Sequence, residues 1–180
     1  MKKYYLSIIL LATFLASVAQ TKSNNIYLEG LGNAVVYSIN YDRLFHISNE
    51  LTIAPRVGFE YIPRRDVDAY GRYTFPTEIN FLYNKNKNNP NHIEAGAGLT
   101  FFSLFDNYQY SVTNEIVGKN YKLAKISTLR LGFRHQKNEG GLMYRAGILV
   151  RLTQDDFSRS RVGGDLFYRI WPGFSIGYTF

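Results

Sequence analysis

Apolar and polar residues alternate with a period of two along most of the chain from Asn25 onwards. Successive side chains of a β-strand point to opposite faces, so this pattern predicts strands that have one apolar face and one face of small or polar residues. Residues 173–180 show it plainly, because every second residue there is aromatic or aliphatic. The alternation predicts eight strands, over residues 25–31, 35–45, 51–61, 73–83, 93–101, 121–135, 142–152 and 173–180.

The connections between these strands sort by parity. Those after the second, fourth and sixth strands are short, whereas three of the other four are long, including a charged loop over 62–72 and a connection over 103–120. Outer-membrane barrels have an even number of strands, short periplasmic turns and longer external loops. A soluble sandwich or a ligand-binding cup also alternates, but neither predicts this parity. The sequence therefore predicts an all-β fold, an eight-stranded antiparallel up-and-down transmembrane β-barrel.

The N-terminus has a different pattern. Lys2 and Lys3 precede an apolar run over 8–18, and the small residues Ser17 and Ala19 stand where a signal peptidase cleaves. The run is short for a membrane-anchoring helix, and no cysteine is present for attachment of a lipid. We therefore predict a secretory signal peptide over 1–19, followed by a barrel domain over 20–180.

Composition narrows the partners. The chain has no cysteine, which excludes disulfides and thiolate metal sites. Its formal net charge of +7 favours anionic lipid head groups and lipopolysaccharide over nucleic acid, which an exported protein does not meet. The chain is rich in aromatic residues, with 15 Tyr and 13 Phe. We interpret eight tyrosines as girdle residues at the membrane interfaces: Tyr27, Tyr37, Tyr41, Tyr61, Tyr73, Tyr83, Tyr144 and Tyr178.

Three short stretches carry a family resemblance: Tyr27–Asn33 (YLEGLGN), Tyr37–Tyr41 (YSINY) and Arg56–Phe59 (RVGF). With the strand pattern, they resemble the small eight-stranded outer-membrane proteins of the OmpX and OmpA-transmembrane-domain kind, and more specifically small barrel proteins of Bacteroidetes-type outer membranes. The resemblance implies a fold and an outer-membrane location without an activity. It also implies that the terminal Phe180 is a signal read by the barrel-assembly machinery during insertion.

Charged residues fall on the polar face of the predicted strands, which faces the lumen. An eight-stranded barrel is narrow enough for its own side chains to fill, and charges there are stable when they are paired. We therefore predict a structural network of paired charges, with an ion path along the same residues as the alternative. Its members are Glu29, Asp42, Arg56, Glu60, Glu78, Glu94, Arg130, Arg134, Arg145 and Arg151.

One motif suggests chemistry. His46, Ser48 and Asn49 form an H-x-S-N sequence, and Glu60 follows. It resembles the motif of the lipid A deacylases (the PagL family), eight-stranded barrels in which His, Ser and Glu form an acyl-transfer triad. That family carries the motif late in the chain and acts in the outer leaflet, whereas His46 and Ser48 here are expected in a periplasmic turn. Glu60 is also expected roughly 35–45 Å from His46 along its strand, too far for a hydrogen bond.

We therefore predict a monomeric barrel with a structural or surface-interaction role, no enzymatic activity, no cofactor and no metal site. A narrow channel or a transporter of small apolar molecules is the alternative, and a lipid A-modifying enzyme the third hypothesis. Any specific contact with lipopolysaccharide phosphates or a surface partner is expected in the external loops, at Arg64, Arg65, Tyr70 and Arg72.

Overall fold

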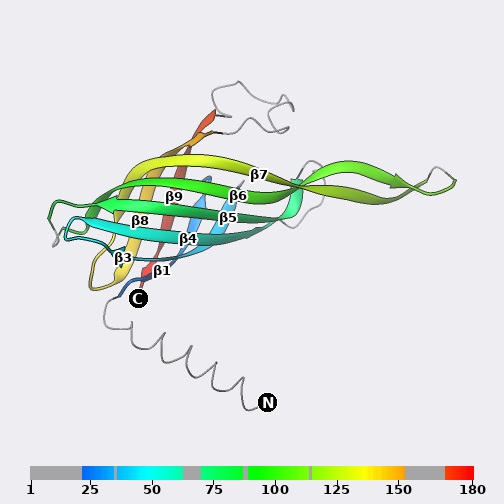
Figure 1. The fold of residues 1–180 in the computed structure, drawn as a ribbon. Coiled ribbons are helices and arrows are strands. Elements are labelled where there is room, and N and C mark those ends of the chain that lie inside the picture. The colour runs from blue at the N-terminus through cyan, green and yellow to red at the C-terminus, as the bar shows by residue number, and fades with distance from the viewer. Residues whose placement is uncertain (1–21, 35, 63–69, 87–88, 114, 153–168) are drawn as a thin grey trace, which may run out of the picture.

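The computed structural model describes residues 22–34, 36–62, 70–86, 89–113, 115–152 and 169–180. Within these residues, nine strand segments form an antiparallel sheet that curves round on itself (Figure 1). The segments are β1 (Asn24–Gly30), β2 (Tyr37–Arg43), β3 (Phe45–His46), β4 (Leu51–Tyr61), β5 (Tyr70–Tyr83), β6 (Asn91–Tyr110), β7 (Ile116–His135), β8 (Gly141–Arg151) and β9 (Ile170–Thr179).

The sheet closes because its first and last strands pair with each other. β9 pairs with both β8 and β1, with Ile26 opposite Tyr178, and β2 pairs with both β1 and β4. β2 and β3 are two segments of one barrel strand, since both pair with β4 and are separated by Leu44 alone. Phe180 and Asn24 exchange two backbone hydrogen bonds that complete the seam. The fold is thus a closed eight-stranded antiparallel β-barrel, and the fold class predicted from the alternation is confirmed.

The polarity of the barrel is the reverse of that of a water-soluble protein. Its outward face carries large apolar side chains, among them Ile39, Phe75 and Ile176, each exposed over about half of its surface or more. Its interior holds most of the buried charged and amide side chains, whereas the described residues contain few buried apolar ones. This division follows from the strand period, because neighbouring residues on each strand face opposite sides of the wall.

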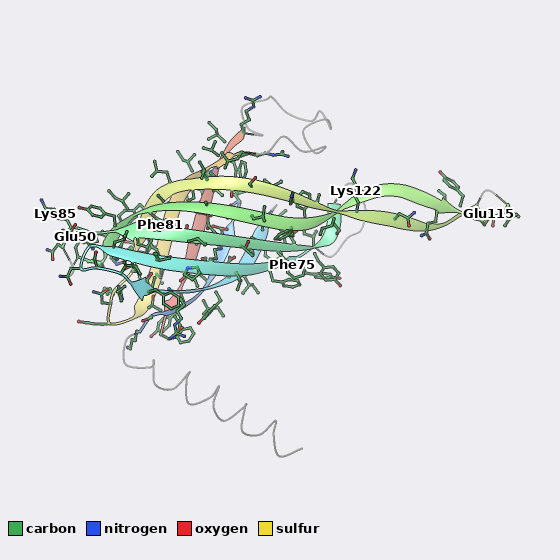
Figure 2. All side chains as sticks on the ribbon, in the orientation of Figure 1. Glu50, Phe75, Phe81, Lys85, Glu115 and Lys122 are labelled. Atoms are coloured by element: carbon green, nitrogen blue, oxygen red, sulfur yellow. The ribbon has the colours of Figure 1, made fainter. Side chains whose placement is uncertain are left out.

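The β6–β7 hairpin extends well beyond the barrel, and here the predicted connection over 103–120 is wrong. β6 continues to Tyr110 and β7 begins at Ile116, so the two strands form a ribbon over 105–121 that projects from one end of the barrel (Figure 1). β5 pairs with β6 as far as Leu104, and β8 pairs with β7 from Thr128. Figure 2 shows Lys122 at the base of the ribbon and Glu115 at its tip.

The three connections predicted to be short lie together at one end of the barrel. Asn24, the first residue of β1, and Phe180 lie at the end that holds the turns over 47–50 and 136–140 and the described residues 84–86 and 89–90 between β5 and β6; we call it the turn end. The ribbon leaves from the opposite, loop end, as Figure 2 shows by the places of Glu50, Lys85 and Glu115. None of the helices among the described residues is long and apolar enough to cross a membrane.

The predicted signal peptide and the predicted external-loop residues are only partly covered by the described residues. Residues 1–19, the predicted signal peptide, and the loop residues Arg64 and Arg65 lie outside the described residues. Tyr70 and Arg72 are not loop residues, because β5 begins at Tyr70. Tyr70 pairs with Leu104 of β6. Because β6 continues beyond the strand predicted over 93–101, β5 also extends beyond the strand predicted over 73–83.

The tyrosines predicted as girdle residues divide into two groups. Seven are exposed on the outward face, at the loop end (Tyr37, Tyr61, Tyr73) and toward the turn end (Tyr41, Tyr83, Tyr144, Tyr178). At the loop end, the Tyr73 ring packs against Phe59 and Tyr61 with ring centroids 6.1 and 5.4 Å apart. Tyr27 is not a girdle residue. It is buried inside the barrel, because it shares the inward phase of Glu29 two positions later on β1.

Candidate functional site

The centre of the lumen is organised around Glu29 of β1. Its carboxylate accepts hydrogen bonds from Arg56 of β4, from Arg130 of β7 at 2.6 Å and from Arg145 of β8 at 2.7 Å. All four side chains are fully enclosed. Three arginines from three different strands therefore converge on one carboxylate. The inward phase of these residues does not by itself specify this geometry.

Glu78 of β5 is the second shared carboxylate. It accepts from Arg56 Nη1 at 2.8 Å and from Arg130 Nε at 2.9 Å, and lies 3.7 Å from Arg145 Nη2. Arg56 is its direct cross-strand partner, and on the other side the register places Gly98 opposite it. A Cβ at Gly98 would lie 2.7 Å from the Asn33 side-chain nitrogen and 2.8 Å from the Thr128 hydroxyl, so the glycine leaves room for these two side chains.

Nearer the turn end, Arg134 and Arg145 stand directly opposite each other on β7 and β8. Like charges in that position repel. Glu94 compensates, because its carboxylate lies 2.9 Å from Arg145 Nη1 and 3.7 Å from Arg134 Nη1. Asp42 of β2 accepts two further bonds from Arg134 at 2.9 and 3.0 Å. Four carboxylates and four guanidinium groups thus form a continuous network with balanced charge.

Neutral side chains complete the network. Two guanidinium groups pack on the Tyr27 ring, that of Arg145 at 4.9 Å and that of Arg56 at 5.6 Å from its centroid, distances at which cation–π attraction operates. The Asn25 side chain donates to Asp42 at 2.5 Å and its oxygen accepts from Gln136 at 2.9 Å. Buried charges are costly unless such partners surround them, so the lumen is consistent with a filled, structural interior.

The loop end of the lumen is capped by residues 31–34 of the β1–β2 connection, which fold inward. Asn33 is buried there, and its backbone amide donates to Glu29 at 3.2 Å. On the far wall, the hydroxyl of Thr100 donates to the Asn33 carbonyl at 2.9 Å and that of Thr128 donates to its side-chain oxygen at 3.0 Å. The Trp171 indole donates to the Gly32 carbonyl at 2.9 Å. This connection therefore joins β1, β6, β7 and β9 across the mouth of the barrel.

The remaining predicted charges lie nearer the loop end. Glu60 accepts hydrogen bonds from the backbone amides of Val36 at 2.8 Å and Tyr37 at 3.1 Å, so it anchors the start of β2. Arg151 is half-buried at the last position of β8, opposite Thr128.

The residues of the H-x-S-N motif do not assemble a catalytic triad. His46 Nδ1 hydrogen-bonds to Thr52 Oγ1 at 2.8 Å, and the Ser48 hydroxyl accepts from the amides of Glu50 and Leu51 within its own turn. Because His46 pairs directly with Thr52, Glu60 lies about 26 Å further along β4 at 3.3 Å per residue. That is closer than the sequence suggested, yet far beyond hydrogen-bonding reach.

A cavity of about 580 Å³ opens at the turn end, and its lining includes Lys22, His46, Ser48 and His92. No group of three or more His, Cys, Asp or Glu side chains that could hold a metal ion occurs among the described residues. His135, the third histidine, stacks on Tyr144 with ring centroids 4.6 Å apart. The His46 and His135 imidazoles thus contact Thr52 and Tyr144, respectively.

Several lumen residues escaped the sequence analysis although their phase marks them. Asn40 and Asn80 each lie two positions from a network carboxylate, and Asn40 accepts from Arg56 at 2.7 and 3.0 Å. Period-two phasing from Asp42 and Glu78 locates both. Asn33 carries no such signal, because its position depends on contacts with residues 67 and 95 positions away in the sequence.

No protein-family model matches the sequence, and no curated protein matches it. Among solved structures, the chain is similar to the N-terminal β-barrel domain of Pseudomonas aeruginosa OprF, with a TM-score of 0.51 and 11% sequence identity. The similarity covers 89% of this chain and 100% of that domain. At this identity the likeness concerns the fold, and the fold thus resembles that of an outer-membrane β-barrel domain.

Proposed function

We propose that this protein is a small integral outer-membrane barrel with a structural and surface-interaction role, and that it is neither a pore nor an enzyme. The observation that carries the proposal is the reversed polarity of the barrel. A band of large apolar side chains surrounds the wall, with tyrosines toward both ends. Contiguous apolar surface of this extent is not stable in water, whereas a bilayer covers it and tyrosines suit the two interfaces.

The closed lumen supports a structural role. A channel needs a continuous aqueous path, but four carboxylates and four arginines pair across the interior, and residues 31–34 cover its loop end. Neighbouring barrel strands are hydrogen-bonded to one another all the way round within the described residues, which disfavours a lateral exit for an apolar substrate. A narrow channel would require the charge network and the cap to open, and a transporter with a lateral exit would require two neighbouring strands to separate.

The ribbon supports a surface-interaction role. Residues 105–121 of β6 and β7 pair with each other beyond the last pairing with β5 and β8, so the ribbon projects from the loop end. Tyr110, Ile116 and especially Val112 at the ribbon's tip are exposed. In this proposal the loop end is external, and lipopolysaccharide and surface molecules are the partners.

The remaining parts of the proposal concern biogenesis and kinship. The chain is exported by its signal peptide, is inserted as a monomer by the barrel-assembly machinery that reads Phe180, and is related to the small barrels of Bacteroidetes-type outer membranes. The outward side chains of Phe174, Ile176 and Phe180 on the closing strand have the alternation such a signal requires.

Site-directed spin labelling tests the proposal, because the chain has no native cysteine. Ile79→Cys on the wall and Val112→Cys on the ribbon are each labelled in reconstituted vesicles. We expect the Ile79 label to be relaxed by lipid-soluble oxygen and shielded from a water-soluble nickel complex, and the Val112 label to show the reverse. Equal exposure of both labels to the nickel complex would show that the band does not face lipid.

A further inference from the structure

The outward face of the barrel carries a hollow of about 450 Å³ over β4 to β7. It lies where the small outward side chains of Thr77, Ala97 and Ser127 are surrounded by larger ones. Thr77, Leu99 and Ser127 lie in one cross-strand row, and Ile79, Ala97 and Leu129 in the next. The outward residues that line the hollow are Pro55, Thr77, Ile79, Ala97, Leu99, Ser127 and Leu152.

Most of the outward residues that line this hollow are aliphatic; its lining also includes Arg56, Glu78, Gly98 and Thr128, which have the inward phase of their strands. Ala97 is exposed on the outward face of β6, between Ile79 of β5 and Leu129 of β7. Leu152 borders the other side, because its amide donates to the Ser127 carbonyl at 2.9 Å and fixes the backbone there. An apolar depression at this place accommodates a hydrocarbon chain rather than a polar solute.

The side chain of Lys125 lies next to the hollow, on the side nearer the loop end. Lys125 is exposed two positions before Ser127 on β7, so both side chains point outward about 7 Å apart along the strand. Lys125 pairs with Phe101, which in turn pairs with Phe75. The described outward residues of β5, β6 and β7 around this row include no acidic side chain that would neutralise the ammonium group.

We propose that the hollow and Lys125 form a lipid-binding site on the outer wall. The hollow takes an acyl chain, and Lys125 binds the anionic phosphate of the same lipid's head group. This proposal rests on the proposed function, since it requires that the wall face a bilayer with the loop end at the interface. Tyr73, two positions nearer the loop end than Phe75 on β5, is an exposed tyrosine of the kind that marks the depth at which head groups begin, and a lysine on a flexible stem reaches a phosphate there.

The test measures which lipids the barrel retains. The purified protein is reconstituted in phosphatidylcholine bilayers that contain a minor fraction of phosphatidylglycerol, and native mass spectrometry counts the lipids that stay bound after transfer to detergent. We expect the wild type to enrich phosphatidylglycerol, whose head group is net anionic, over zwitterionic phosphatidylcholine. Lys125→Ala should lower that enrichment about fivefold, and Lys125→Arg should keep it. Ala97→Phe, which fills the hollow, should lower retention of both lipids.

Matched controls separate the site from general effects. Ala95→Phe changes another outward alanine of β6 that does not line the hollow, and Lys137→Ala removes an exposed lysine at the turn end, so both should behave as the wild type. Every variant is first checked for flotation with vesicles and a heat-dependent gel shift. Failure of the wild type to insert would overturn the proposed function. Insertion with unselective retention, or with Lys125→Ala and Ala97→Phe unchanged, would overturn the lipid site alone.

Discussion

Replacing Glu29 by glutamine tests the idea that paired charges hold the lumen together. Glu29 accepts hydrogen bonds from Arg56, Arg130 and Arg145, all fully enclosed, and the change leaves four arginines facing three carboxylates. Removing one partner of a buried ion pair costs about 3–5 kcal/mol. Because Arg56 and Arg130 retain Glu78 and Arg145 retains Glu94, we expect the lower end, about 3 kcal/mol.

Urea unfolding of the vesicle-inserted barrel measures this cost, with the fluorescence of Trp171, the chain's single tryptophan, as the signal. Glu139→Gln, an exposed residue of the 136–140 turn, is the matched control and should stay within about 0.5 kcal/mol of the wild type. The double variant Glu29→Gln/Arg130→Gln restores equal charge and should be less destabilised than Glu29→Gln alone. If Glu29→Gln unfolds like Glu139→Gln, the reasoning about the network is refuted.

Two further predictions concern the closing strand. Gly177→Ala should destabilise the barrel by about 1–3 kcal/mol in the same urea assay, because a Cβ there would overlap the Ile26 carbonyl oxygen and the Tyr27 backbone; Gly30→Ala, where a Cβ meets nothing within 4 Å, is the control, and equal midpoints for the two variants would contradict the argument. Deleting Phe180 should lower the amount of heat-modifiable barrel in outer-membrane fractions without preventing export, because the insertion signal is lost; a normal amount would count against that role.

The strand pattern specifies most of the barrel because the wall itself has two environments. Ile39 and Phe75 face outward and Glu29 and Arg56 face inward, as their positions in the alternation require. The same phase places Tyr27 inside, and its interpretation as a girdle residue failed because residue type was given more weight than phase. Where a filled lumen and an apolar outer face constrain a strand, period two is thus a reliable guide.

Beyond the wall that constraint disappears. Both faces of the ribbon over 105–121 lie outside the barrel, so its strands need no strict alternation and resemble a loop in the sequence. The cap formed by Asn33 cannot be predicted from the sequence pattern for a different reason. Its partners Thr100 and Thr128 are far away in the sequence, on the opposite side of the barrel. The convergence of three arginines on Glu29 likewise depends on side-chain paths across the lumen, which strand phase does not determine.

Conductance of the purified protein in a planar lipid bilayer is the most direct test of the central claim, that the barrel spans the membrane with a filled lumen. The network around Glu29 and the cap over 31–34 predict that the wild-type protein inserts without stable ohmic current steps. Reproducible ohmic steps from folded, inserted wild-type protein would contradict the filled lumen and would favour a narrow channel.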